Sequence, residues 1–240
     1  MTDGSLDRLP RTREAIAAGI RDRLHLGAQL YVCLQGETVA DAALGEDRPG
    51  EPLTRDHLML WLSATKPVPA VAIAQLWERG LLELDDPVAL HIPEFAANGK
   101  EGITLRHLLT HTGGIRMLDT GWPHQSWAEI IAKICAMKPE PRWVPGQKAG
   151  YHQASSWFIL GEVVQRITEK TMREVLAELI LDPLGFRWGN YGVAPEDVEK
   201  VSPSYVTGPP LLPPFSNIVK RVLGQSIDKV VAASNDPRFL

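Results

Sequence analysis

A serine and a lysine three residues apart, Ser63 and Lys66, are the residues of this chain best suited to covalent chemistry. A serine hydroxyl is a poor nucleophile at neutral pH and needs a nearby base. Residues three apart on a helix share one face, with Cβ atoms about 5–6 Å apart. A lysine that is desolvated in an apolar pocket can also lose its proton. The pair is therefore a candidate nucleophile and base, although a chain of 240 residues can contain this pattern by chance.

The residues that flank the pair bear on whether it is buried. They are mostly apolar: Trp61, Leu62, Pro67 and Val68. This flank predicts a buried site for Lys66 rather than a solvated position in a first helical turn. Taken alone, Ser63 could instead be only the N-cap of the helix that follows.

The composition is that of an ordinary globular chain, with 44% hydrophobic and 22% charged residues and a net charge of −4. Enough apolar surface is present for one domain or for two closely joined lobes. The slight acidic excess gives no electrostatic footprint for nucleic acid or for an anionic membrane. Neither an N-terminal hydrophobic signal nor an apolar run of membrane-spanning length is found, so we expect a cytoplasmic protein. The two cysteines, Cys33 and Cys135, are predicted to be buried thiols, with a disulfide left open.

The spacing of the apolar residues predicts two N-terminal strands before a mostly helical body. The expected elements are a helix over 11–24, strands over 28–34 and 39–44, a polar loop over 45–56, a helix from Ser63 to Arg79 capped by Gly80 with an irregular start at Pro69, a short helix after an N-cap at Thr104, a helix over 126–138, a turn-rich stretch over 139–150, a helical stripe from Trp157 to Ile167, and a helix over 171–181. Proline is frequent after residue 201, which excludes a central strand there.

Three stretches resemble the serine β-lactamase and penicillin-binding-protein superfamily, in its class C-like and esterase-like branch. They are residues 60–92 with Ser63-x-x-Lys66, residues 103–115 with the His111-Thr112-Gly113-Gly114 loop, and residues 145–186 with Pro145-Gly146 ahead of Tyr151. The resemblance implies an α+β fold, in which helices flank an antiparallel sheet and an all-helical lobe follows the nucleophile. We expect the N-terminal helix and strands in 1–62, the helical lobe in 63–200 and a proline-rich end in 201–240, with the C-terminal sheet strands missing.

The resemblance also implies an acyl-enzyme mechanism. Ser63 would attack a carbonyl, and Lys66 would help to deprotonate it. Tyr151 would act as base toward the nucleophile and then as acid toward the leaving group. The backbone N–H of Ser63 would donate to the oxyanion.

Two departures from the family pattern limit what the resemblance implies. The second motif is Tyr151-His152-Gln153 where lactamases usually have an asparagine two residues after the tyrosine. Gln153 could still bring an amide to the substrate, with a longer reach. The third motif, Lys-Thr-Gly or His-x-Gly, is not found after Tyr151, where the nearest string, Val206-Thr207-Gly208, lacks a cation and runs into prolines.

Other residues near the motifs have structural alternatives. His107 and His111 are four apart but lack the glutamate and third ligand of a zinc site, so they are expected to anchor loops. His152 could line the pocket or face solvent. Trp122 and Trp143 fall in loops near the expected cleft and are candidates to shape an apolar acyl pocket.

The sequence therefore predicts a serine hydrolase or acyltransferase for small esters or amides, with no metal or organic cofactor and no nucleic-acid or membrane partner. A β-lactamase or D-Ala-D-Ala carboxypeptidase is the alternative within the same class. The alternative of another class is an inactive, truncated fragment without the third motif. Its oxyanion hole would lack one donor, a loss of about 10²–10³ in rate in studied hydrolases.

Overall fold

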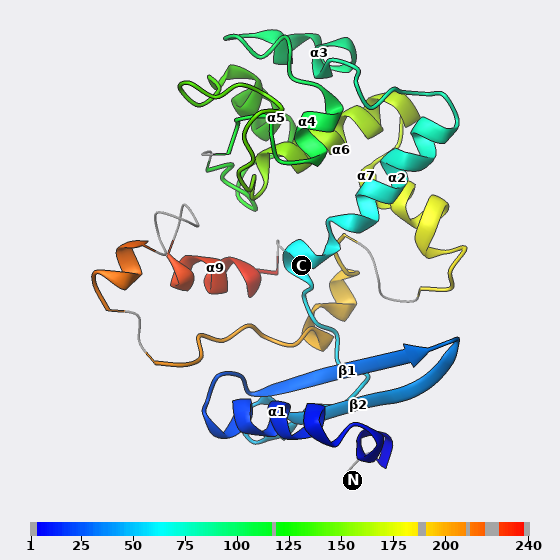
Figure 1. Cartoon of the computed structure of the whole chain (residues 1–240), viewed down its shortest axis with the longest axis vertical. Coiled ribbons are helices and arrows are strands. Elements are labelled where there is room, and N and C mark those ends of the chain that lie inside the picture. The colour runs from blue at the N-terminus through cyan, green and yellow to red at the C-terminus, as the bar shows by residue number, and fades with distance from the viewer. Residues whose placement is uncertain (1–3, 117–118, 187–190, 210–211, 219–225, 238–240) are drawn as a thin grey trace. The chain divides into compact units, whose positions relative to one another are not determined.

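The structure is a computed structural model of the chain, and it describes residues 4–116, 119–186, 191–209, 212–218 and 226–237. These residues form two compact units. The first combines Met1–Leu60 with Ala194–Pro237 and holds the sheet; the second is Trp61–Val193 and is helical. Figure 1 shows the strands and α1 in one part and the helices α2 to α7 in another. The predicted α+β fold is confirmed.

The sheet unit is built on an antiparallel hairpin. Its elements are η1 (Gly4–Arg8), α1 (Pro10–Arg21), β1 (Gly27–Leu34), β2 (Glu37–Arg48), β3 (Glu51–Pro52), η5 (Pro195–Lys200) and α9 (Ile227–Ser234). The strand order is β1-β2-β3, with Leu30 opposite Ala42 and Val32 opposite Ala40. These residues lie on one face of the hairpin, where they pack with apolar residues that precede α1, as expected for side chains that alternate along a strand.

Two predictions for this unit were wrong. Residues 45–56 are not only a loop, because β2 continues to Arg48 and pairs with β3 through a turn at Gly50, whose φ is +85°. Polar side chains are tolerated there because an edge strand can face water. Cys33 is exposed rather than buried, because it follows a register shift after Val32 and lies on the opposite face from the packed residues. Cys135 is buried as predicted, and both thiols are free.

The helical unit encloses the main hydrophobic core. Its elements are η2 (Leu62–Thr65), α2 (Pro67–Glu78), α3 (Val88–His91), η3 (Pro93–Ala96), α4 (Leu105–Leu109), α5 (Trp127–Ala136), α6 (Ser155–Thr168), α7 (Met172–Leu176) and the π-helical turn η4 (Ala177–Leu181). Helix α6 is largely buried, and its side chains at Ile159, Leu160, Val163 and Val164 pack in this core. The predicted helical stripe is confirmed.

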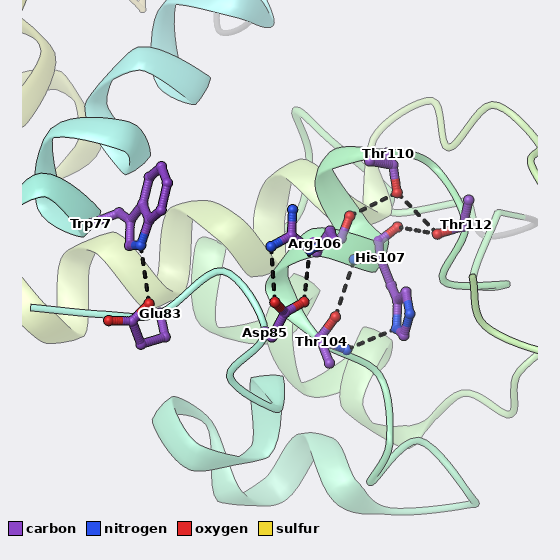
Figure 2. A network of polar contacts seen from close by, with 8 residues as sticks. All are labelled: Trp77, Glu83, Asp85, Thr104, Arg106, His107, Thr110 and Thr112. Carbon is purple, nitrogen blue, oxygen red and sulfur yellow. Dashed lines mark hydrogen bonds and ion pairs between the residues drawn. The ribbon is translucent and has the colours of Figure 1, made fainter. Parts of the chain in front are cut away.

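Local hydrogen bonds fix where the helices of this unit begin. Thr104 is the N-cap of α4: its hydroxyl accepts from the N–H of His107 at 3.3 Å, and the His107 Nδ1 accepts from the N–H of Thr104 at 3.2 Å (Figure 2). The predicted cap is therefore confirmed, in the form of a reciprocal capping box. Ser126 and Thr171 cap α5 and α7 in the same way.

A charged side chain is fully buried in this core. Lys100 has no exposed surface, and its Nζ donates to the carbonyl oxygens of Ala97, Cys135 and Met137 at 2.6, 2.8 and 2.6 Å. The last two carbonyls belong to the C-terminal end of α5, which leaves such groups without helical partners. Lys100 therefore joins the end of α5 to the loop after η3.

The nucleophile segment differs from the helix predicted between Ser63 and Arg79. Residues Leu62–Thr65 form a 3-10 turn, and α2 begins only at Pro67. Pro67 and Pro69 lie in the first helical turn, where an N–H has no intrahelical partner to lose. The end of α2 is as predicted: Gly80 follows the C-cap with φ +68°, and its N–H donates to the Trp77 carbonyl at 2.9 Å. Among the helices of the described residues, none is both long and apolar enough to cross a bilayer.

Candidate active site

Ser63 and Lys66 are in direct contact. The Nζ of Lys66 donates a hydrogen bond to the Oγ of Ser63 at 2.8 Å. The 3-10 turn explains the contact, since residues three apart are eclipsed in a 3-10 helix. The backbone supports it as well, because the Lys66 N–H donates to the Ser63 carbonyl at 3.3 Å. The oxygen of the candidate nucleophile therefore lies within one hydrogen bond of the lysine nitrogen.

The serine lies on the surface of the helical unit, after a strained residue. Leu62 has a φ of +46°, in the left-handed region that branched residues rarely adopt. Ser63 is exposed and Lys66 is half-buried. Trp61 and Leu62 are exposed too, at 64% and 47%, so the prediction that this apolar flank buries Lys66 was wrong. In the described part of the chain, the side chains near Lys66 belong instead to the loops that precede α5 and α6.

Tyr151 lies beside the lysine. The centroid of its ring is 5.2 Å from the Nζ of Lys66, a distance suited to a cation–π contact. Tyr151 lies in the coil before α6 and is 53% exposed. The structure thus brings together the three residues that the sequence singled out for catalysis. Gln153, two residues further on, is exposed.

His111 is a fourth member of this cluster, which the sequence interpretation placed only as a loop anchor. Its ring centroid lies 4.9 Å from that of Tyr151 and 5.6 Å from that of His152. Its Nδ1 accepts from the backbone N–H of His152 at 3.1 Å, so the anchoring role is confirmed. Burial, and then the charge of Lys66, lower the pKa of His111 below its ordinary value. The signal available in the sequence was the position of His111 within the matched His-Thr-Gly-Gly loop.

His152 is not a substrate-binding residue in this structure, and both positions considered for it were wrong. Its side chain is 0% exposed. Its Nε2 accepts from the N–H of Ile115 at 3.0 Å, which satisfies a buried amide of the glycine loop. Burial lowers the pKa of His152 to about 4. The ring therefore faces inward because a buried backbone donor needs it.

The two tryptophans assigned to the acyl pocket have different environments. Trp143 is only 9% exposed, and its Nε1 donates to the Thr112 carbonyl at 2.8 Å. The Arg116 guanidinium lies 4.9 Å from the Trp143 ring centroid. Trp143 thus packs under the loop that contains Thr112 and is too buried to form a pocket wall, which corrects the prediction. Trp122 is 42% exposed and packs on Phe158 with ring centroids 6.1 Å apart, so it remains a candidate.

One further sequence candidate, the Val206-Thr207-Gly208 string, makes hydrogen bonds to backbone groups of the sheet unit. The Gly208 N–H donates to the Arg23 carbonyl at 2.8 Å, and the Thr207 hydroxyl donates to the Leu24 carbonyl at 2.7 Å. The Val206-Thr207-Gly208 string is therefore tied to the end of α1, beside a groove of about 810 Å³. The N–H of Gly208 is therefore already used in a hydrogen bond within the sheet unit. In the described part of the chain, no three His, Cys, Asp or Glu side chains cluster as metal ligands would.

Comparisons with known proteins identify the family of this chain. The family model described as Beta-lactamase matches residues 12–222. The esterase/beta-lactamase LipL of Mycobacterium tuberculosis is 30% identical over 76% of this chain and 43% of its own length. Esterase EstB of Burkholderia gladioli is 29% identical over 80% of this chain and 53% of its own length.

A solved structure gives the same result for the fold. A penicillin-binding-protein homologue from Caulobacter crescentus superposes with a TM-score of 0.70 and 31% identity, over 83% of this chain and 54% of that one. The chain spans about half the length of the relatives that it matches. It belongs to the beta-lactamase family, within the superfamily of serine β-lactamases and penicillin-binding proteins, as its motifs predicted.

Proposed function

We propose that the chain acts as an esterase-type serine hydrolase that forms an acyl-enzyme on Ser63. The observation that carries the proposal is the 2.8 Å contact between the Lys66 Nζ and the Ser63 Oγ, with the Tyr151 ring 5.2 Å from the same nitrogen. A serine becomes a useful nucleophile when a base lies within hydrogen-bond reach. The esterase relatives support this reaction class.

The reaction follows from these contacts. The Ser63 Oγ attacks the carbonyl carbon of the ester, while its proton passes to the Lys66–Tyr151 pair. The backbone N–H of Ser63 donates to the oxyanion that develops. The bond to the alcohol oxygen then breaks, and Tyr151 returns a proton to the departing alcohol. Water attacks the acyl carbon in the second half, which releases the acid and restores the Ser63 hydroxyl.

We assign the exposed side chains of Gln153 and Trp122 to contact with the substrate. Gln153 can donate or accept a hydrogen bond through its amide. Trp122 can cover an apolar acyl chain. The residues suit a small ester, and no step needs a metal or an organic cofactor. A β-lactam is the second candidate substrate, because the name of LipL includes both activities.

Labelling with a fluorophosphonate probe tests the nucleophile. Attack by the Ser63 Oγ forms an O–P bond and releases fluoride, and peptide mapping locates the adduct. We expect labelling of Ser63, no labelling in Ser63→Ala, and labelling slowed by about 10²–10⁴-fold in Lys66→Ala, the usual contribution of a general base. Ser216→Ala, which changes a serine of the sheet unit, is the matched control and should label like the parent.

A folded protein that takes no label at Ser63 would overturn the proposal and favour the inactive-fragment alternative.

The substrate class is then tested by comparing hydrolysis of the ester p-nitrophenyl butyrate with hydrolysis of the chromogenic cephalosporin nitrocefin. We expect faster hydrolysis of the ester. Hydrolysis of nitrocefin alone would make the β-lactam the substrate.

A further inference from the structure

We propose that His111 is a positioning residue that holds Tyr151 against Lys66 by binding the backbone on both sides of the tyrosine. The inference rests on the proposed function, since positioning matters only if Tyr151 moves a proton. His111 itself touches neither the serine nor the substrate in this scheme.

His111 accepts hydrogen bonds from the residues on either side of Tyr151. Its backbone carbonyl accepts from the N–H of Gly150 at 2.9 Å, and its Nδ1 accepts from the N–H of His152 at 3.1 Å. The two donors are the residues immediately before and after Tyr151. The imidazole ring also packs on the phenol ring, with centroids 4.9 Å apart. Tyr151 is therefore restrained at both flanking peptides and at its ring by the same residue.

The turn that carries His111 is itself held firmly. The Thr110 hydroxyl donates to the Arg106 carbonyl at 2.8 Å and lies 3.0 Å from the Thr112 hydroxyl, as Figure 2 shows. The Thr112 N–H donates to the His107 carbonyl at 2.8 Å. His111 lies between these two threonines with a φ of +58°, a conformation that is costly for most side chains. The capped helix α4 thus supplies a rigid base from which His111 reaches the tyrosine.

The protonation state of His111 decides whether its Nδ1 can accept the hydrogen bond from the His152 N–H. A neutral imidazole whose Nδ1 accepts a hydrogen bond has its proton on Nε2, and a protonated imidazole has no acceptor. Protonation would therefore break the bond to His152 and add a second cation near Lys66. The ionisable groups that face the ring are Lys66, Tyr151 and His152. Burial and the charge of Lys66 favour the neutral ring, so the contact is present at neutral pH and is lost in acid.

Two substitutions of His111 distinguish the effect of losing the Nδ1 acceptor from the effect of changing the backbone conformation. Asparagine and glycine both tolerate a positive φ, but only asparagine offers an oxygen near the position of Nδ1. We expect His111→Gly to slow fluorophosphonate labelling of Ser63 by about 10–100-fold, the cost of a misplaced catalytic group. His111→Asn should stay within about threefold of the parent, the size of a weakened neutral hydrogen bond. His91→Asn, which removes a contact to Asp86 outside the site, should label like the parent.

The tyrosine variant shows whether His111 acts through Tyr151. In a Tyr151→Phe background, His111→Gly should cause no further loss, because the proton-transfer group is already gone. The labelling rate of the parent should fall in acid as His111 protonates, and His111→Asn should remove that part of the profile. Parental labelling by His111→Gly, or an undiminished loss in the Tyr151→Phe background, would overturn the inference.

The tautomer of His111 can be measured independently of activity. The nitrogen chemical shifts of ¹⁵N-labelled histidine at neutral pH should show His111 protonated at Nε2 and unprotonated at Nδ1. The opposite tautomer would contradict the inference even in a protein that labels normally. Absence of labelling in the parent with the expected tautomer would instead refute the proposed function and leave the contact to Tyr151 in place.

Discussion

Acid should destabilise the helical unit through one buried imidazole, that of His152. The ordinary pKa of histidine is about 6.5, and burial lowers that of His152 to about 4 in the folded chain. Between these values the unfolded chain binds a proton that the folded chain does not. Stability contributed by the neutral ring is thus fully present above about pH 6.5 and is lost as the pH falls toward 4.

The magnitude follows from the size of the pKa shift. Each unit corresponds to about 1.4 kcal/mol, so a fall to about pH 4.5 removes about 2–3 kcal/mol from the free energy of unfolding. Domains of this size are stable by about 5–15 kcal/mol, so the loss is a large share. His152 is suited to this test because its side chain has no exposed surface and solvent does not screen it.

Urea unfolding followed by tryptophan fluorescence measures this effect, because all seven tryptophans lie between residues 61 and 188. The comparison is between the parent and His152→Gln, whose amide oxygen can still accept from the N–H of Ile115. Between about pH 7.5 and 4.5 the parent should lose about 2–3 kcal/mol more than the variant. His124→Gln, at an exposed loop position, is the control and should follow the parent. Equal losses in the parent and in His152→Gln would refute the reasoning.

Three other substitutions should lower the free energy of unfolding of the same unit, each for a different reason, and urea titration checks all of them. Thr104→Ala removes the N-cap of α4 and should cost about 1 kcal/mol, with Thr104→Ser restoring most of it. Gly114→Ala should cost about 2 kcal/mol or more, because φ is +75° and the new Cβ would overlap the Trp143 indole; parental stability would contradict this packing. Lys100→Met should cost about 3 kcal/mol, since three buried carbonyls lose their donor, and a neutral result would mean that water replaces the ammonium.

Features governed by neighbours in the sequence were predictable. The hairpin strands follow from alternation, the N-cap at Thr104 from a hydroxyl before an apolar run, and the end of α2 from Gly80. The contact between Ser63 and Lys66 belongs to this class too, because three residues of spacing suffice to bring them together. Tyr151 could be placed only through the family resemblance, since 85 residues separate it from Lys66 in the chain.

Features governed by distant partners were not predictable from local pattern. His152 is buried because Ile115, 37 residues earlier, presents an amide that needs an acceptor. Trp143 is buried because the carbonyl of Thr112 accepts from its indole, 31 residues away. In both cases the side chain alone suits either a pocket or a core. A backbone group elsewhere decides between them, and its position is known only once the chain has folded.

The geometry of the nucleophile shows how a local residue refines a contact that a spacing of three residues already allows. In an α-helix, residues three apart are rotated by about 60° about the axis, whereas in a 3-10 turn they are eclipsed. An α-helix starting before Ser63 would need the residue at 67 to donate to the Ser63 carbonyl, and a proline has no N–H to donate. That carbonyl accepts instead from the N–H of Lys66, which is the bond that closes a 3-10 turn. Pro67 thus selects the turn that aligns the Lys66 amine with the Ser63 hydroxyl, and α2 begins immediately afterwards.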